Sequence, residues 1–237
     1  MSKHFSVLIE AGQERWHTLY KLTGYSIVTM LVIMLIQITV FAASPFPESI
    51  ELWYKLFNEN WLLGLVHMDL LYIINNLIVA IMYLALYLSL RRRNESLMLI
   101  ALLMGLLGIA AYLASNRAFE MLSLSTQYYS AISDSAKIAL LAAGHTMIAS
   151  WKGTAFDIYY ILNGVSLIII SGVMFQSPLF SKRTAAIGLA SGILMMIPST
   201  AGTIGMVFAL ASLVPWAIFA VMVAIKMFWL ASDPCDS

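Results

Sequence analysis

Six long apolar stretches dominate this chain, and most of its charged residues lie in the segments between them. The stretches cover about 24–43, 61–90 (or 67–90), 97–116, 154–175, 184–197 and 204–230. A helix needs about 20 mostly apolar residues to cross a hydrocarbon core of roughly 30 Å. We therefore predict an all-α fold, a polytopic transmembrane helical bundle with about six spans and interfacial amphipathic helices.

Composition supports a membrane location. Charged residues make up 11% of the 237 positions and hydrophobic residues 61%, whereas soluble domains carry about 25% charged residues. These values exclude a water-soluble domain, a disordered tail and a nucleic-acid partner. A single cysteine also excludes a disulfide framework within the chain.

The predicted organisation has three parts. Residues 1–21 form a cytoplasmic-side amphipathic helix, residues 22–232 the six-span membrane domain, and residues 233–237 a cytoplasmic tail. Within the membrane domain, segments 44–60 and 117–152 form an outer cap. The first is expected to hold a short helix over 47–57, and the second a helix capped by Asp134. The fifth stretch has only 14 residues before Pro198, so it spans only if the helix continues or the bilayer thins.

Lysine and arginine are unevenly distributed between the two sides of this topology. The side of the N-terminus carries nine: Lys3, Arg15, Lys21, Arg91, Arg92, Arg93, Lys182, Arg183 and Lys226. The other side carries four: Lys55, Arg117, Lys137 and Lys152. Because cytoplasmic loops of membrane proteins are enriched in positive charge, we expect both termini in the cytoplasm.

Two acids fall inside the predicted spans, and both are candidates for function because a charge at that depth is costly unless it faces protein or water. Asp69 shares a helical stripe with Tyr72 and Asn76, and Asp157 shares one with Tyr160. A third stripe, on 97–116, contains small residues that allow close helix packing. We predict that these stripes meet in an outer-half ligand-binding cluster that contains Asp69, Tyr72, Asn76, Asn116, Arg117, Asp157 and Tyr160.

Other interpretations stay open at this point. Asp69 or Asp157 could instead pair with Arg117 or Lys152 and hold the helices together. A membrane-embedded hydrolase or metalloenzyme would need converging ligands or a nucleophile motif, and no such motif is present. No catalytic residue, metal ligand or cofactor is predicted. A third alternative is a structural or accessory subunit of a membrane complex.

Three segments resemble a prokaryotic multipass membrane family that is known only as a domain of unknown function. They are Ala114–Leu122, Trp151–Asp157 and Ile197–Gly205. The resemblance extends from about the second span to the last. It implies a bundle of about six helices in a bacterial or archaeal cytoplasmic (inner) membrane, and no activity, ligand or catalytic residue.

The expected function is therefore noncatalytic binding, sensing or translocation of a small or amphiphilic ligand at the outer-half polar site. The expected partners are membrane lipids, a small-molecule or lipid ligand, and a second copy of the chain or a membrane-complex partner.

Overall fold

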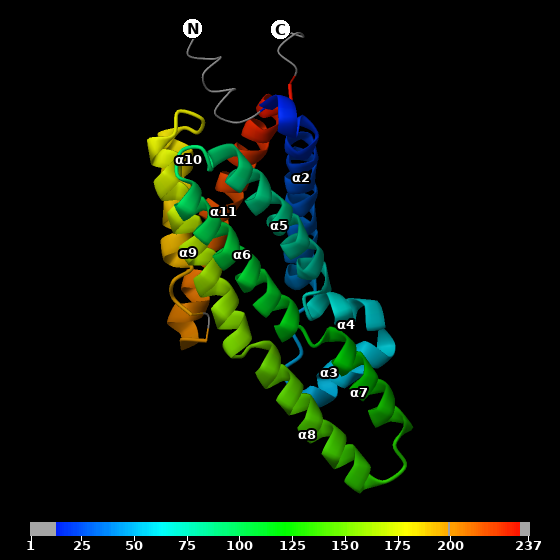
Figure 1. Cartoon of the computed structure of the whole chain (residues 1–237). Coiled ribbons are helices and arrows are strands. Elements are labelled where there is room, and N and C mark those ends of the chain that lie inside the picture. Colours follow the sequence, from blue (N-terminus) through cyan, green and yellow to red (C-terminus); the bar gives the residue numbers. More distant parts are fainter. Residues whose placement is uncertain (1–12, 199, 233–237) are drawn as a thin grey trace, which may run out of the picture.

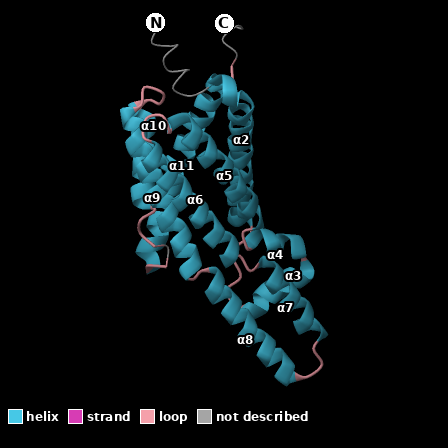
Figure 2. Cartoon of the chain, viewed as in Figure 1, coloured by secondary structure: helices cyan, strands magenta, loops and turns pink. Residues whose placement is uncertain are grey.

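The computed structural model describes residues 13–198 and 200–232, and these residues form helices and connecting turns without a strand (Figures 1 and 2). The helices are α2 (Gln13–Ala43), α3 (Ile50–Glu59), α4 (Trp61–His67), α5 (Leu70–Leu90), α6 (Glu95–Ser115), α7 (Ala118–Ser130), α8 (Asp134–Trp151), α9 (Thr154–Gln176), α10 (Lys182–Leu194) and α11 (Gly202–Leu230). The all-helical prediction is confirmed.

The helices divide into a bundle and a cap. Figure 1 shows α2, α5, α6, α9, α10 and α11 packed as a bundle, with the start of α2 and the end of α11 at one end. The cap, made of α3, α4, α7 and α8, lies at the opposite end. Helix α7 follows α6 after a break at Asn116, and α8 precedes α9 across a break at Gly153. The two predicted outer segments therefore form one structured cap.

Five helical stretches in the described chain are long and apolar enough to cross a membrane: Trp16–Ala43, Leu70–Leu90, Glu95–Ser130, Asp134–Gln176 and Gly202–Leu230. The predicted fifth span is shorter than expected, because α10 has 13 residues and ends before Met195. At 1.5 Å per residue such a helix is about 20 Å long, less than the hydrocarbon thickness.

Several boundaries differ from the predictions. The predicted second stretch is broken into α4 and α5 by Asp69. The predicted cap at Asp134 is wrong by one residue: Ser133 accepts the capping hydrogen bond from the backbone of Ala136. The short outer helix is present as α3. Residues 13–21, predicted as part of a separate amphipathic helix, form the first turns of α2. Residues 1–12 of the predicted amphipathic helix and the predicted tail lie outside the described residues.

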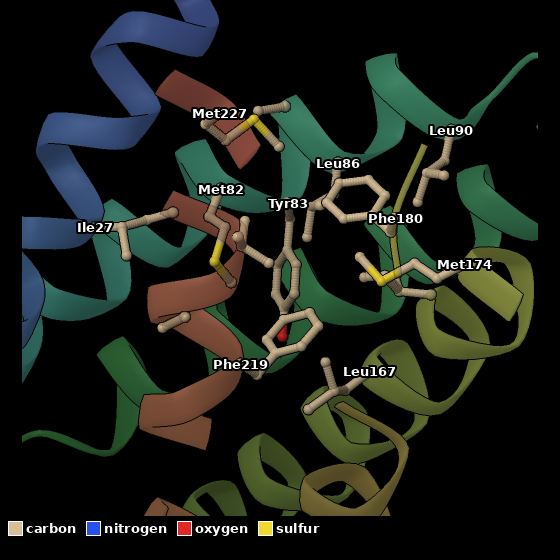
Figure 3. Close-up of a cluster of buried hydrophobic side chains, with 14 of the residues drawn as sticks. Ile27, Met82, Tyr83, Leu86, Leu90, Leu167, Met174, Phe180, Phe219 and Met227 are labelled. Atoms are coloured by element: carbon tan, nitrogen blue, oxygen red, sulfur yellow. The ribbon is translucent and has the colours of Figure 1, made fainter. Parts of the chain in front are cut away.

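Two separate hydrophobic clusters stabilise the two parts. The bundle core joins α2, α5, α6, α9 and α11 near the terminal end, and Figure 3 shows its packing around Tyr83, Leu86, Met174 and Phe219. The cap core consists of Ile50, Trp53, Tyr54, Phe57, Leu65, Met68, Ala118, Met121 and Trp151. Between these two clusters lies a layer of the bundle in which the side chains leave open space.

Glycines allow α6 to approach α9 closely, as the small-residue stripe predicts. A Cβ atom on Gly108 would lie 2.4 Å from Asn163 Nδ2 and 3.2 Å from the backbone oxygen of Tyr159. The backbone oxygen cannot rotate away, so α6 can approach α9 this closely only because Gly108 has no side chain. By contrast, a Cβ atom on Gly172 of α9 would have no atom within 4 Å.

We expect Gly108→Ala to destabilise the protein by about 1–3 kcal/mol, the usual cost of overpacking a tight contact. Gly172→Ala is the matched control and should be neutral or stabilising, since alanine is favoured over glycine in a helix by roughly 1 kcal/mol. Thermal unfolding of both variants in lipid nanodiscs measures the difference. Equal unfolding temperatures for the two variants would contradict the close α6–α9 contact.

Candidate functional site

A cavity of about 180 Å³ lies in the layer between the bundle core and the cap core. Side chains from α2, α5, α6, α9, α11 and the end of α10 surround it. Its lining consists of Met30, Met34, Asp69, Tyr72, Asn75, Asn76, Val79, Tyr83, Tyr112, Phe156, Tyr159, Tyr160, Asn163, Met195, Ala209, Leu210, Ser212, Leu213 and Trp216. The cavity therefore combines one acid, several amides and a large aromatic surface.

The size pattern along α11 explains why space remains here. Beyond Pro215, the helix buries large side chains such as Phe219, Val223 and Met227 in the bundle core. Before Pro215, the buried positions hold only small residues, Gly205, Ala209 and Ser212. Small side chains cannot reach α5 across the bundle, so this half of α11 borders a void and not a packed core.

Asp69 lies at the cap end of the cavity, where the chain bends from α4 into α5. Its backbone adopts a left-handed conformation, with φ 65° and ψ 26°. Aspartate tolerates this conformation better than most residues other than glycine, although it remains unfavourable. The bend ends one helix and starts the next, and it turns the carboxylate inward, where the residue is 9% exposed.

Two neutral donors hold the Asp69 carboxylate. Gln37 Nε2 of α2 donates to Oδ1 at 3.2 Å, and the Trp151 indole Nε1 of α8 donates to Oδ2 at 3.0 Å. Within the described chain, no lysine, arginine or histidine nitrogen lies within 4 Å of this carboxylate. The Lys152 ammonium lies over the Trp151 ring instead, 5.1 Å from its centroid. Asp69 thus joins α2, α5 and α8 without an ion pair.

Unused acceptors surround the acid. The side-chain oxygens of Gln37, Asn75 and Asn76 are buried and accept no hydrogen bond from the described residues. For Asn76 the amide orientation is fixed, because its nitrogen donates to the backbone oxygen of Tyr72 at 2.9 Å. Each unpaired buried acceptor costs about 1–3 kcal/mol relative to a paired one. The acid therefore lies beside buried acceptors that a donor could still pair with.

Aromatic rings form the wall that α6 and α9 contribute. The ring centroids of Tyr112 and Tyr159 are 4.9 Å apart, those of Phe156 and Tyr160 5.3 Å, and those of Tyr159 and Tyr160 5.4 Å. Such ring pairs stabilise the wall, and all four rings line the cavity together with Asp69.

Four of the seven predicted site residues line the cavity: Asp69, Tyr72, Asn76 and Tyr160. The other three lie elsewhere. Asn116 Nδ2 donates to the backbone oxygen of Met68 at 2.8 Å, and Arg117 donates to Ser150 Oγ at 3.2 Å. Asp157 accepts hydrogen bonds from the backbone and hydroxyl of Thr200. These residues join helices and turns around the cavity and do not line it.

Sequence reasoning missed the two donors to Asp69. A single buried glutamine inside an apolar span is itself a signal, so Gln37 could have been found. No local pattern connects Trp151, which is 82 residues away in the chain, to Asp69. Asn75 and Tyr159 were missed because each is the neighbour in sequence of a residue on a predicted polar stripe, and only the packing of α5 against α6 and α9 shows that both line the cavity.

The described residues contain no group of three or more histidine, cysteine, aspartate or glutamate side chains that could hold a metal ion. His67, two residues before Asp69, is fully buried, and its ring nitrogens lie 3.0 Å from the backbone oxygen of Leu63 and 2.9 Å from that of Ser44. Both nitrogens face carbonyl groups, so the ring joins α4 to the end of α2.

The cap is a rigid partner for Asp69. Tyr54 donates to the backbone oxygen of Leu140 at 2.7 Å, and Ser125 donates to that of Tyr54 at 2.8 Å, which joins α3 to α8 and α7. Burial raises the pKa of Tyr54 to about 12, so the hydroxyl stays a neutral donor. Trp151 therefore reaches Asp69 from a fixed surface.

The fold and the cavity define an all-helical multipass membrane protein with a cavity of mixed polarity next to a helical cap. The chain belongs to the family described as Domain of unknown function (DUF4386), whose model matches residues 22–231. The match begins in α2, so it includes the first span, which the sequence resemblance left out. No curated protein and no solved structure matches the chain.

We expect Trp151→Phe to destabilise the protein by about 1–3 kcal/mol, because a buried carboxylate oxygen loses its donor. Trp61→Phe is the control, since Trp61 is 57% exposed. In an Asp69→Asn background the effect of Trp151→Phe should shrink, because hydrogen bonds to charged groups are the stronger ones. Unfolding in nanodiscs measures this double-mutant cycle. Purely additive effects would contradict the Asp69–Trp151 hydrogen bond.

Proposed function

We propose that the cavity binds a small amphiphilic molecule that carries an amine, reversibly and without chemical conversion. The observation that carries this proposal is the position of Asp69, a buried acid that has no ion pair with any described residue and that lines a cavity beside an aromatic wall. Charged side chains inside membrane proteins commonly pair with one another, so a cation is a suitable partner for this acid.

The ligand is proposed to be a donor because buried acceptors beside the acid are unpaired. Asn75 and Asn76 present unpaired oxygens, and each Asp69 oxygen holds one donor and keeps a lone pair for another. An ammonium group has up to three N–H donors to satisfy them. The faces of Tyr159 and Tyr160 add cation–π attraction, worth about 2 kcal/mol where water is excluded.

The volume of the cavity limits the size of the bound group. An apolar cavity of about 150 Å³ holds a benzene molecule, so about 180 Å³ accepts an amine with one ring or a short chain. Binding pockets of this kind combine an apolar lining with a few polar groups that fix orientation.

The contacts of the cavity favour binding over catalysis. Among the lining residues the only serine is Ser212, whose hydroxyl donates to the Ala209 backbone of its own helix at 2.7 Å. The lining contains no histidine or cysteine to act as base or nucleophile.

The Asp69–Trp151 hydrogen bond joins the cavity to the cap. It supports a sensing role, in which the cap responds to a ligand bound in the cavity.

We also place the protein in a cytoplasmic membrane with the cap outside. The inner turns, at 91–94 and 177–181, lie at the same end of the bundle as the start of α2 and the end of α11 (Figure 1). Arg91, Arg92, Arg93, Lys182 and Arg183 stand at or beside these turns. The positive-inside rule then places this end in the cytoplasm.

We expect benzylamine to stabilise the protein in nanodiscs and benzyl alcohol, the neutral analogue of similar size, to do so at least tenfold more weakly. Asp69→Asn should weaken benzylamine binding at least tenfold, because the carboxylate charge is lost while asparagine keeps the left-handed bend. Asp157→Asn is the control and should bind as the parent protein does. Calorimetric titration measures all four affinities, and equal binding by the two Asp→Asn variants would overturn the proposal.

The orientation is tested by labelling with a membrane-impermeant maleimide after Cys235→Ser removes the native thiol. Ile132→Cys, at a fully exposed position between α7 and α8, should react in intact cells. Arg93→Cys, in the exposed turn between α5 and α6, should react only after permeabilisation. The reverse pattern would show the cap inside the cell.

A further inference from the structure

One wall of the cavity reaches the outer surface of the bundle. Leu210 of α11 lines the cavity and is also 61% exposed. Val207 and Val214, about one helical turn to either side, are 56% and 64% exposed. Because these apolar side chains belong to a membrane-spanning helix, the surface that they form faces hydrocarbon and not water.

Helices α2 and α11 contact each other at the opposite end from this opening. The rings of Tyr25 and Phe228 are 5.1 Å apart, and a Cβ atom on Gly24 would lie 2.8 Å from Phe228. From this contact the two helices diverge toward the cap, as Figure 1 shows. Met34 of α2 lines the cavity while the next residue, Leu35, is 63% exposed.

Polarity changes across the cavity in the same direction. Among the lining residues, the acid stands at the start of α5, and the unpaired amides of Asn75 and Asn76 lie within α5. The side chains that α2 and α11 contribute are almost all apolar: Met30, Met34, Ala209, Leu210, Leu213 and Trp216, with Ser212 bonded to its own helix. A molecule that satisfies both sides has a polar head and an apolar extension.

The geometry points to a single-chain alkylamine as the ligand class, with its ammonium at Asp69 and its tail passing between α2 and α11, beside Leu210, into the bilayer. This inference rests on the proposed amine-binding function. It adds that the ligand has an alkyl tail and that this tail leaves the cavity between α2 and α11. The ligand enters laterally from the membrane leaflet on the cap side, because the indole of Trp151 covers Asp69 from the cap.

Leu210→Trp tests the exit, since a larger ring at an exposed position narrows the opening without entering a packed core. Ile225→Trp is the matched control, on the same helix and 64% exposed but absent from the cavity lining. The probes are dodecylamine and benzylamine, titrated in nanodiscs of one phosphatidylcholine composition so that partitioning into lipid is equal for every variant.

We expect Leu210→Trp to weaken dodecylamine binding at least tenfold more than it weakens benzylamine binding, with Ile225→Trp changing neither. If dodecylamine binding is unchanged in Leu210→Trp, or if both amines weaken equally, the lateral exit is overturned. If benzylamine does not bind the parent protein, the proposed function itself fails, which is a different result.

A second measurement needs no variant. Dodecylamine with a photoreactive diazirine at the end of its tail is bound to the parent protein in nanodiscs, irradiated, and mapped by peptide mass spectrometry. Labels on α2 and α11 between about 34–38 and 206–214 support the exit between these helices. Labels confined to α7 and α8 would instead show a tail that lies in the cap, and would overturn it.

Discussion

The structure depends on how one acid is buried. Asp69 occupies the point where the chain leaves the cap and enters the membrane bundle, and its carboxylate meets Gln37 from α2 and Trp151 from α8. A buried charge costs several kcal/mol unless it is paired or hydrogen-bonded. The two donors reduce that cost only when all three elements are in place. This requirement fixes the left-handed bend at Asp69 and the position of the cap over the bundle.

Two apolar clusters and one polar layer follow from this arrangement. Large side chains close the bundle core, and the aromatic cap core closes the other end. The layer between them stays open because α11 changes from large to small buried residues at Pro215. In a soluble protein water could fill such a layer and satisfy Asn75 and Asn76. In a membrane the same acceptors depend on protein, trapped water or a ligand.

Local sequence patterns predicted the helices well, since apolar length and small-residue spacing act within single segments. They also placed Asp69, Tyr72 and Asn76 together, because a helical stripe needs only nearby residues. They could not show that Gln37 and Trp151 meet Asp69, which lies 32 and 82 residues away. Asp157 shows the same limit: it has a stripe like that of Asp69, but its partner is Thr200 in the turn between α10 and α11. Which acid lines the cavity is decided by tertiary packing.

The position of Asp69 also constrains how any ligand could act. The carboxylate that lines the cavity is the one that accepts from Trp151, so a cation in the cavity and the cap indole share one acceptor group. Coupling between two such partners is reciprocal. If a bound ligand changes the free energy of the Asp69–Trp151 hydrogen bond, that hydrogen bond changes the free energy of ligand binding by the same amount. Its size is bounded by the hydrogen bond concerned, about 1–3 kcal/mol. That is five- to more than a hundredfold in affinity, enough for a cap at the membrane surface to respond to what the cavity contains.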